Sequence, residues 1–95
     1  MGVHAVVLVQ CEIDAIPEAA QAIADLDGVS EVYSVAGEFD LVAIVRVSVH
    51  DDLARVIPGG IARVNGVART ETLTAFQVFS RHDLDRLFSI GFDGS

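Results

Sequence analysis

The chain has 95 residues, a formal net charge of −8, and apolar residues at 52% of its positions. That length suits a single domain with one modest hydrophobic core. Proteins that bind nucleic acids directly concentrate Lys and Arg to neutralise phosphates, whereas this chain has six Arg, no Lys and fourteen acidic residues. The composition therefore argues against direct contact with DNA or RNA.

The apolar content exceeds what a domain of this size can bury alone, since a small fold has a high ratio of surface to volume. The longest uninterrupted apolar runs, Ala5–Val9 and Leu41–Val45, fall far short of the roughly 18 residues that span a bilayer. We therefore expect no membrane segment, and we expect self-association to cover the excess. The first four residues lack signal-peptide features and Cys11 is the only cysteine, which predicts a cytoplasmic protein without disulfides.

Residues 3–11 are rich in Val and predict a central β-strand. Side chains alternate along a strand, so one face carries Val3, Ala5, Val7, Val9 and Cys11, and the other carries His4, Val6, Leu8 and Gln10. Both faces are largely apolar, so both should be covered. We expect helices of the same chain on one face and the sheet of a second copy on the other.

A first helix is predicted to start within residues 14–18, where Pro17 suits the first turn and Glu18 suits the positive end of the helix dipole. Its apolar residues follow a helical spacing and are Ile16, Ala19, Ala20, Ile23, Ala24 and Leu26. Asp27-Gly28 should end this helix. Residues 29–36 and 41–49 then predict two strands that pair as a hairpin around a turn at residues 37–40.

A second helix should begin within residues 50–52, with Asp51 or Asp52 as its cap. The apolar residues expected to face the core are Leu53, Val56 and Ile57. Pro58-Gly59-Gly60 should kink or loosen this helix before residues 61–64. After a turn at Asn65-Gly66, residues 67–79 predict a long fourth strand and residues 81–90 a short amphipathic helix.

The predicted order is β-α-β-β-α-β followed by a C-terminal helix. This is the ferredoxin-like α+β sandwich, in which a four-stranded antiparallel sheet carries its helices on one face. No linker or low-complexity tract divides the chain, so residues 1–95 are expected to form one domain.

Two segments resemble the ligand-binding domain of the Lrp/AsnC regulators. Gly28-Val29, followed by residues 35–42 (VAGEFDLV), is similar to the family pattern GV…xxGxxD(L/V). Residues 65–72 (NGVARTET) are similar to the pattern pGVxxTxT at the start of the last strand. The resemblance covers essentially the whole chain. The break at Pro58-Gly59-Gly60 departs from the family and leaves the shape of the second helix open.

The resemblance implies a dimeric α+β barrel in which two sheets pack face to face, and dimers that join into higher oligomers such as octamers. It also implies a small effector, typically an amino acid, bound between dimers near the hairpin turn. Full-length members carry an N-terminal helix-turn-helix, whereas Val3 here opens directly on the first strand. We therefore expect a stand-alone effector-binding and oligomerisation module that modulates transcription through assembly, with a helix-turn-helix Lrp/AsnC regulator as a candidate partner.

The turn Gly37-Glu38-Phe39-Asp40 is the main candidate binding segment, and two interpretations stand. A hairpin turn alone explains it, with Gly37 at positive φ and Asp40 bonded to backbone. The second interpretation adds a ligand pocket, in which Gly37 lets a carboxylate approach backbone N–H groups and Glu38 or Asp40 receives an ammonium. The family resemblance favours the second interpretation, and the residues themselves leave both open.

Three further residues are candidate ligand contacts. Thr70 and Thr72 share one face of the fourth predicted strand and either serve as ordinary strand residues or line the same interfacial pocket. Tyr33 lies on the strand before the turn, where it either packs half-buried or touches a ligand. Arg46 interrupts an apolar strand, so it should pair with an acidic residue at an interface or reach water at an edge.

Patterns for catalysis and metal binding are poor in this sequence. His4, His50 and His82 lie in separate predicted elements without metal-ligand spacing, and no nucleophile elbow or phosphate loop is present. We therefore assign no catalytic residue, metal or cofactor. One alternative is a small enzyme of the dimeric α+β barrel type, such as a cofactor-free monooxygenase or isomerase, which would need polar residues between helices and sheet. Another is a purely structural oligomerisation domain.

Overall fold

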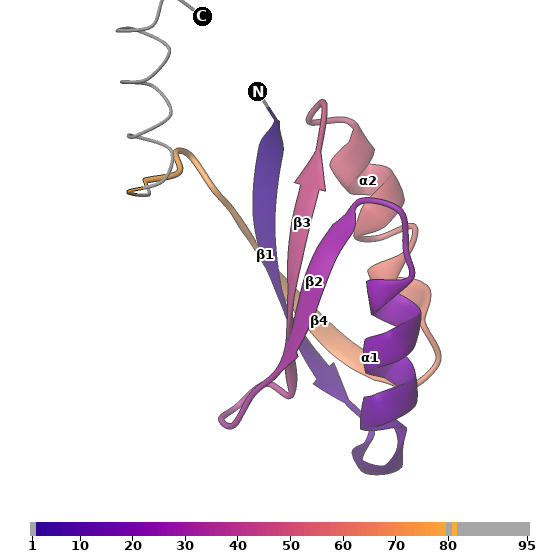
Figure 1. Ribbon diagram of the computed structural model, residues 1–95. Coiled ribbons are helices and arrows are strands. Elements are labelled where there is room, and N and C mark those ends of the chain that lie inside the picture. The colour runs from indigo at the N-terminus through magenta and orange to yellow at the C-terminus, as the bar shows by residue number, and fades with distance from the viewer. Residues whose placement is uncertain (1, 80, 82–95) are drawn as a thin grey trace, which may run out of the picture.

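The computed structural model describes residues 2–79 and Arg81. The elements are β1 (Val3–Cys11), α1 (Ile16–Ala24), β2 (Val29–Ser34), β3 (Leu41–Val47), α2 (Asp52–Val56) and β4 (Val67–Thr74) (Figure 1). Two short 3-10 turns, η1 (Ile13–Ala15) and η2 (Ile61–Arg63), precede α1 and follow α2. The predicted βαββαβ order is confirmed. The predicted helix over residues 81–90 lies outside the described residues, Arg81 excepted.

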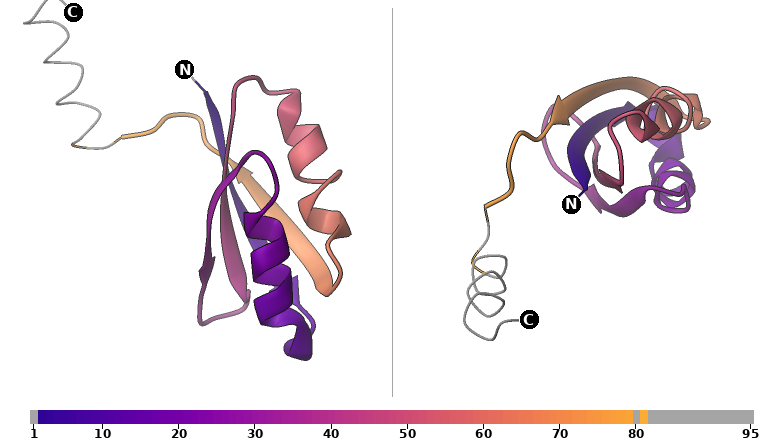
Figure 2. Two further views of the ribbon diagram at one scale, coloured as in Figure 1. Left: turned by 45° about the vertical axis from the view of Figure 1, so that its right-hand side comes forward. Right: turned by 90° about the horizontal axis from the view of Figure 1, so that it is seen from above.

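The four strands form one antiparallel sheet in the order β2-β3-β1-β4. The two inner strands are therefore β1 and β3, and both helices pack on the same face of the sheet (Figure 2). Val6 of β1 lies opposite Ile44 of β3 and Leu73 of β4, which shows how the register aligns the three strands. This architecture confirms the ferredoxin-like α+β fold.

The core lies between the sheet and the helices. The buried side chains of the two inner strands are Ala5, Val7, Val9 and Cys11 on β1, and Leu41, Ala43, Val45 and Val47 on β3. The helices and turns complete it with Ala19, Ile23, Leu53, Val56, Ile57 and Ile61. Each fully buried Val, Leu or Ile contributes roughly 1.5–3 kcal/mol relative to exposure. The predicted inward residues of the second helix are thus confirmed.

The opposite side of the sheet, which we call the open face, is covered by neither helix. The strand register places on it His4, Val6, Leu8 and Gln10 of β1, Val42, Ile44 and Arg46 of β3, Glu31 and Tyr33 of β2, and Arg69, Glu71 and Leu73 of β4. Its centre is apolar, because Val6, Leu8, Val42 and Ile44 are adjacent and only partly buried. The predicted division of β1 into two apolar faces is confirmed.

Several predicted boundaries were too long. The fourth strand ends at Thr74 rather than at residue 79. The N–H of Ala75 still donates to the carbonyl of His4 at 2.9 Å, and the described pairing with β1 stops there. The hairpin strands end at Ser34 and Val47, because the chain turns away from the sheet after each.

The ends of the helices also differ from the prediction. The first helix ends at Ala24, before Asp27-Gly28, which instead lead into β2 with Gly28 at φ +101°. Asp51 is the N-cap residue of the second helix, as predicted, but its side chain makes no capping hydrogen bond. The break at residues 58–60 is confirmed, since α2 ends at Val56 and a separate 3-10 turn follows. No helix in the described ranges is both long and apolar enough to cross a membrane.

Candidate functional site

The hairpin loop between β2 and β3 is held to the rest of the sheet at its base. The N–H of Val35 donates to the carbonyl of Asp40 at 3.0 Å, and the N–H of Asp40 donates to the carbonyl of Val9 at 2.9 Å. Gly37, at the tip, has φ +146°, and a Cβ built there would meet no atom within 4 Å. The loop therefore has an anchored base and an open tip whose backbone a ligand can approach.

Asp40 anchors this loop to the end of β1. Its Oδ2 accepts a hydrogen bond from the backbone N–H of Cys11 at 2.8 Å. The Asp40 carboxylate is partly buried, and so one of its oxygens already has a structural partner. Burial, and after it the negative charge of Asp40, raises the pKa of the Cys11 thiol. The Cys11 side chain, at the end of β1, is thus a buried and protonated thiol.

Arg69 of β4 joins the loop from the other side. Its guanidinium lies 3.4 Å from Oε2 of Glu38 and 4.9 Å from the centre of the Phe39 ring. Gln10, opposite Arg69 in the strand register, donates from Nε2 to the carbonyl of Glu38 at 3.4 Å. We call Gln10, Glu38, Phe39 and Arg69 the Arg69 cluster. It places a cation, a carboxylate and an aromatic ring beside the open tip at Gly37.

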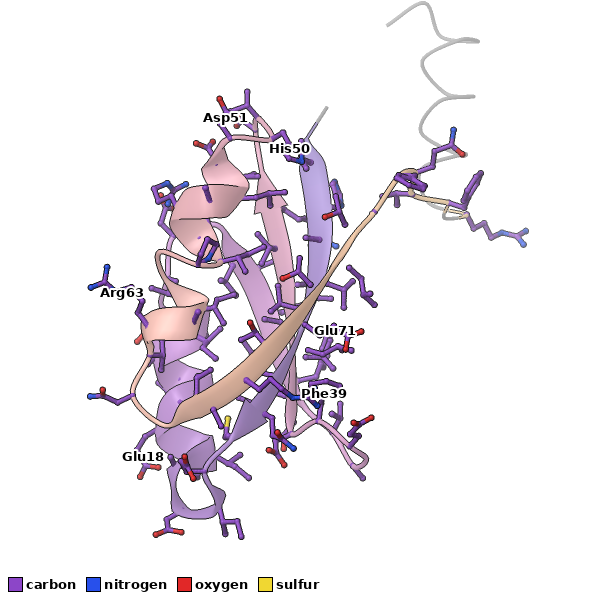
Figure 3. All side chains as sticks on the ribbon, turned by 180° about the vertical axis from the view of Figure 1, so that it is seen from behind. Glu18, Phe39, His50, Asp51, Arg63 and Glu71 are labelled. Atoms are coloured by element: carbon purple, nitrogen blue, oxygen red, sulfur yellow. The ribbon has the colours of Figure 1, made fainter. Side chains whose placement is uncertain are left out.

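Figure 3 shows Phe39 on the side of the sheet opposite Arg63, which lies with the helices. The Arg69 cluster therefore adjoins the open face. Gln10 and Arg69 were not among the predicted site residues. An Arg and a Gln on two different strands give no local signal, and only the register between β1 and β4 brings them together.

The other predicted site residues lie apart from this cluster. Tyr33 is on the open face of β2, and its hydroxyl donates to Oε2 of Glu31 at 2.8 Å; mainly this bond raises the pKa of the Tyr33 hydroxyl. Thr70 and Thr72 lie opposite Val9 and Val7 and so point to the helix side of β4. Because β2 and β4 are the outer strands, about 14 Å of sheet separates Tyr33 from the threonines. A single chain does not unite all seven residues.

Arg46 does not occupy an edge, because β3 is an inner strand. Its guanidinium lies 3.9 Å from Oε1 of Glu31 on the neighbouring strand, and both side chains are about half exposed. An exposed pair of this kind contributes about 0–1 kcal/mol. The edge interpretation is therefore wrong, and within one chain the acidic partner of Arg46 is Glu31. Among the residues that the structure describes, no group of three or more His, Cys, Asp or Glu is arranged to hold a metal ion.

The family model of the Lrp/AsnC ligand binding domain matches residues 4–84. The chain belongs to this family. An uncharacterized HTH-type transcriptional regulator of Pyrococcus horikoshii is 39% identical over 59 residues, which are 62% of this chain and 39% of that protein. A second such regulator, from Pyrococcus furiosus, is 32% identical over 79 residues, or 80% of this chain and 53% of that protein. The chain thus spans about half or less of these Lrp/AsnC-type relatives.

Solved structures agree with the family assignment. A crystal structure of a Thermus thermophilus protein superposes with a TM-score of 0.78 at 43% identity, covering 83% of this chain and 99% of that one. E. coli AsnC gives a TM-score of 0.76 at 25% identity and covers 83% and 54%. A Neisseria meningitidis transcriptional regulator, solved as a complex with L-Met, shares the fold at a TM-score of 0.73 and 14% identity, covering 83% and 53%. The predicted resemblance to the Lrp/AsnC ligand-binding domain is confirmed.

Proposed function

We propose that this Lrp/AsnC domain binds a small metabolite, most simply an amino acid, at the β2–β3 hairpin where copies of the chain meet. Binding would then be transmitted to transcription through assembly. The observation that carries the proposal is the composition of the loop: an open glycine tip flanked by the Glu38 carboxylate and the Arg69 guanidinium.

The charges of the Arg69 cluster match those of a free amino acid. An amino acid presents a carboxylate and an ammonium a few ångströms apart. Arg69 suits the carboxylate, since a guanidinium donates two parallel hydrogen bonds to it. Glu38 suits the ammonium better than Asp40 does, because an Asp40 oxygen already accepts the Cys11 N–H. The exposed ion pair between Glu38 and Arg69 contributes only about 0–1 kcal/mol. A bound zwitterion can therefore break this pair at little cost and form one new ion pair with each of the two side chains.

The ligand site is expected to be completed by another copy. The loop adjoins the open face, whose apolar centre is covered by neither α1 nor α2. Packing two such faces would bury apolar surface at about 25 cal/mol per Å² and form a dimeric α+β barrel. It also offers a route by which Tyr33 of one copy and the hairpin of another approach one ligand, with dimers joining further into a higher oligomer. That a transcriptional regulator with the same fold is solved with L-Met supports amino acids as the ligand class.

A regulatory role is favoured over an enzymatic one by the character of the core. An enzyme of the dimeric α+β barrel type would need convergent polar groups between helices and sheet. Among the described residues, every buried side chain in that layer is apolar or the Cys11 thiol, and the pKa of that thiol is raised. A thiolate nucleophile requires the opposite shift. The naming of the Pyrococcus relatives as transcriptional regulators supports the same conclusion.

Thermal-shift screening against the twenty amino acids, followed by calorimetry, tests the proposal. A ligand at 100 times its Kd should stabilise the folded protein by about 2.7 kcal/mol. Glu38→Gln and Arg69→Gln should each weaken binding by about tenfold, the cost of roughly one charge-assisted bond. Arg63→Gln, on the helix side, is the charge-matched control and should bind as the parent does. If no amino acid stabilises the parent protein, the proposed ligand class is wrong.

A helix-turn-helix regulator of the same family is the proposed partner. Mixed assembly would let a chain with an acidic balance reach DNA indirectly. The test is co-expression with a tagged regulator from the same organism and analysis of the complex by size exclusion. Failure to recover mixed oligomers, with and without the amino acid, would contradict this part of the proposal.

A further inference from the structure

Large apolar side chains lie exposed at the end of β4 and in the described residues that follow it. Phe76 is 101% exposed and Phe79 is 84% exposed, while Leu73 and Val78 are each half exposed. We call residues 75–79 the apolar arm. Scattered single apolar residues are normal on a protein surface, but three within four residues, next to the half-exposed Leu73 of β4, mark a surface that meets a partner.

The direction of the arm identifies the side on which that partner lies. Both views of Figure 2 show the arm leaving the sheet on the side opposite the helices, away from the body of the domain. The last bond to its own sheet is from the N–H of Ala75 to the carbonyl of His4. Residues 76–79 therefore project into the space in front of the open face without covering it.

The open face and the arm are complementary and belong to the same chain. The face offers Val6, Leu8, Val42 and Ile44 at its centre. The arm offers two exposed phenylalanines, whose rings carry its largest apolar surfaces. A protein that stacks on the open face would occupy the space into which the arm extends. With two chains related by a two-fold axis, each arm meets the other copy, so the contact is made twice.

We propose that the apolar arm reaches across to a second copy of this chain and clamps it against the open face through Phe76 and Phe79. This inference rests on the proposed face-to-face assembly, but it assigns a different contact. The open faces form the buried centre of the dimer interface, and the arms add a second contact at its periphery. The arm thus extends the dimer interface past the edge of the sheet.

The first test compares the dimer dissociation constant of the parent with that of Phe76→Ser/Phe79→Ser, using light scattering coupled to size exclusion over a dilution series. The Kd should rise at least tenfold, because paired phenylalanine anchors lose their apolar contact. Ile13→Ser is the matched control, since Ile13 is 87% exposed in η1, outside the arm, and should change the Kd less than twofold. Circular dichroism should show an unaltered fold in both variants.

The second test uses the fact that the chain has no tryptophan. In Phe76→Trp, the indole emission should shift to shorter wavelength as the concentration rises through the dimer Kd. An unshifted emission in a dimeric sample would overturn the arm proposal and leave the face-to-face dimer and the ligand site standing. A parent protein that is monomeric at every concentration would overturn the assembly and the arm together, while the amino-acid screen would still report on the ligand site separately.

Discussion

At the scale of single residues, the two acidic side chains of the proposed binding loop differ in their contacts. Asp40 is held by the Cys11 N–H, whereas Glu38 is exposed and paired only with Arg69 and through its backbone with Gln10. The sequence left the turn and pocket interpretations of this loop open. The structure assigns a turn role to Asp40 through its hydrogen bond to Cys11, and it leaves Glu38 as the acidic group that a ligand would meet first.

Removing the Asp40 carboxylate should destabilise the fold. In Asp40→Ala the Cys11 N–H loses its partner in a partly buried place, which should lower the free energy of unfolding by about 1–3 kcal/mol. Asp40→Asn keeps an acceptor oxygen and should lose less. Urea denaturation of the two variants and the parent measures the difference. Equal losses in Ala and Asn would mean that the negative charge, rather than the hydrogen bond, is what stabilises this corner.

The Cys11 thiol should be unreactive in the folded protein. It is buried and its pKa is raised by burial and by Asp40, so iodoacetamide at pH 8 should modify it at least tenfold more slowly than in the urea-unfolded chain. The folded state holds this proton to higher pH than the unfolded state does. The protonated Cys11 thiol therefore contributes its full share to the free energy of unfolding below the ordinary thiol pKa of about 8.5. That contribution is lost as the pH rises through the raised pKa of the folded state. Cys11→Ala should show a shallower alkaline loss.

At the scale of elements, the connections differ in how tightly they are packed. The turn into β2 places Gly28 against the second helix, where an added Cβ would lie 2.7 Å from Cγ2 of Val56. The tip of the β2–β3 hairpin has no such neighbour at Gly37. Both glycines have positive φ, so they share the backbone constraint and differ in the space around them. A loop open at its tip and anchored at its base suits ligand access.

A pair of glycine substitutions separates these two effects. Gly37→Ala should cost about 1–3 kcal/mol from backbone strain alone. Gly28→Ala should cost at least about 1 kcal/mol more, because the new methyl must displace Val56 in a close-packed core. Thermal and urea unfolding of both variants measure the two values. If the variants were equally stable, the contact between the turn and α2 would have to relax without cost.

At the scale of the whole molecule, the open face explains the high apolar content. Both inner strands alternate between a core side and a side that the described residues leave partly exposed. The four residues at the centre of the open face, Val6, Leu8, Val42 and Ile44, are all uncharged, and Glu31, Arg46 and Glu71 lie around them. A domain built in this way is expected to reach its stable form as an assembly.

A charge placed on the open face should therefore dissociate the assembly without unfolding the chain. Ile44→Arg would bury an unpaired guanidinium between two sheets, which should raise the dimer Kd at least a hundredfold, about 2.8 kcal/mol. Ala62→Arg is the control with the same added charge, because Ala62 is exposed in η2 on the helix side. Light scattering and circular dichroism give the two readouts. A dimer that tolerates Ile44→Arg would have to use another surface.

The sequence by itself determined the order of elements, the two faces of β1, the hairpin and the family. These depend on periodicity within one segment and on short patterns of glycine and polar residues, which are local properties of the chain. It also placed the candidate loop at residues 37–40, where the structure has an open and anchored turn.

Only the tertiary structure decided which residues meet. Arg69 reaches Glu38 across 31 positions of sequence and Gln10 reaches the same residue across 28, because β1 lies between β3 and β4 in a particular register. The same register turns Thr70 and Thr72 to the helix side and away from Tyr33. β4 ends at Thr74, which lies opposite Ala5, although β1 itself begins at Val3, and the apolar arm follows. Strand pairing is a long-range choice, and no single segment encodes it.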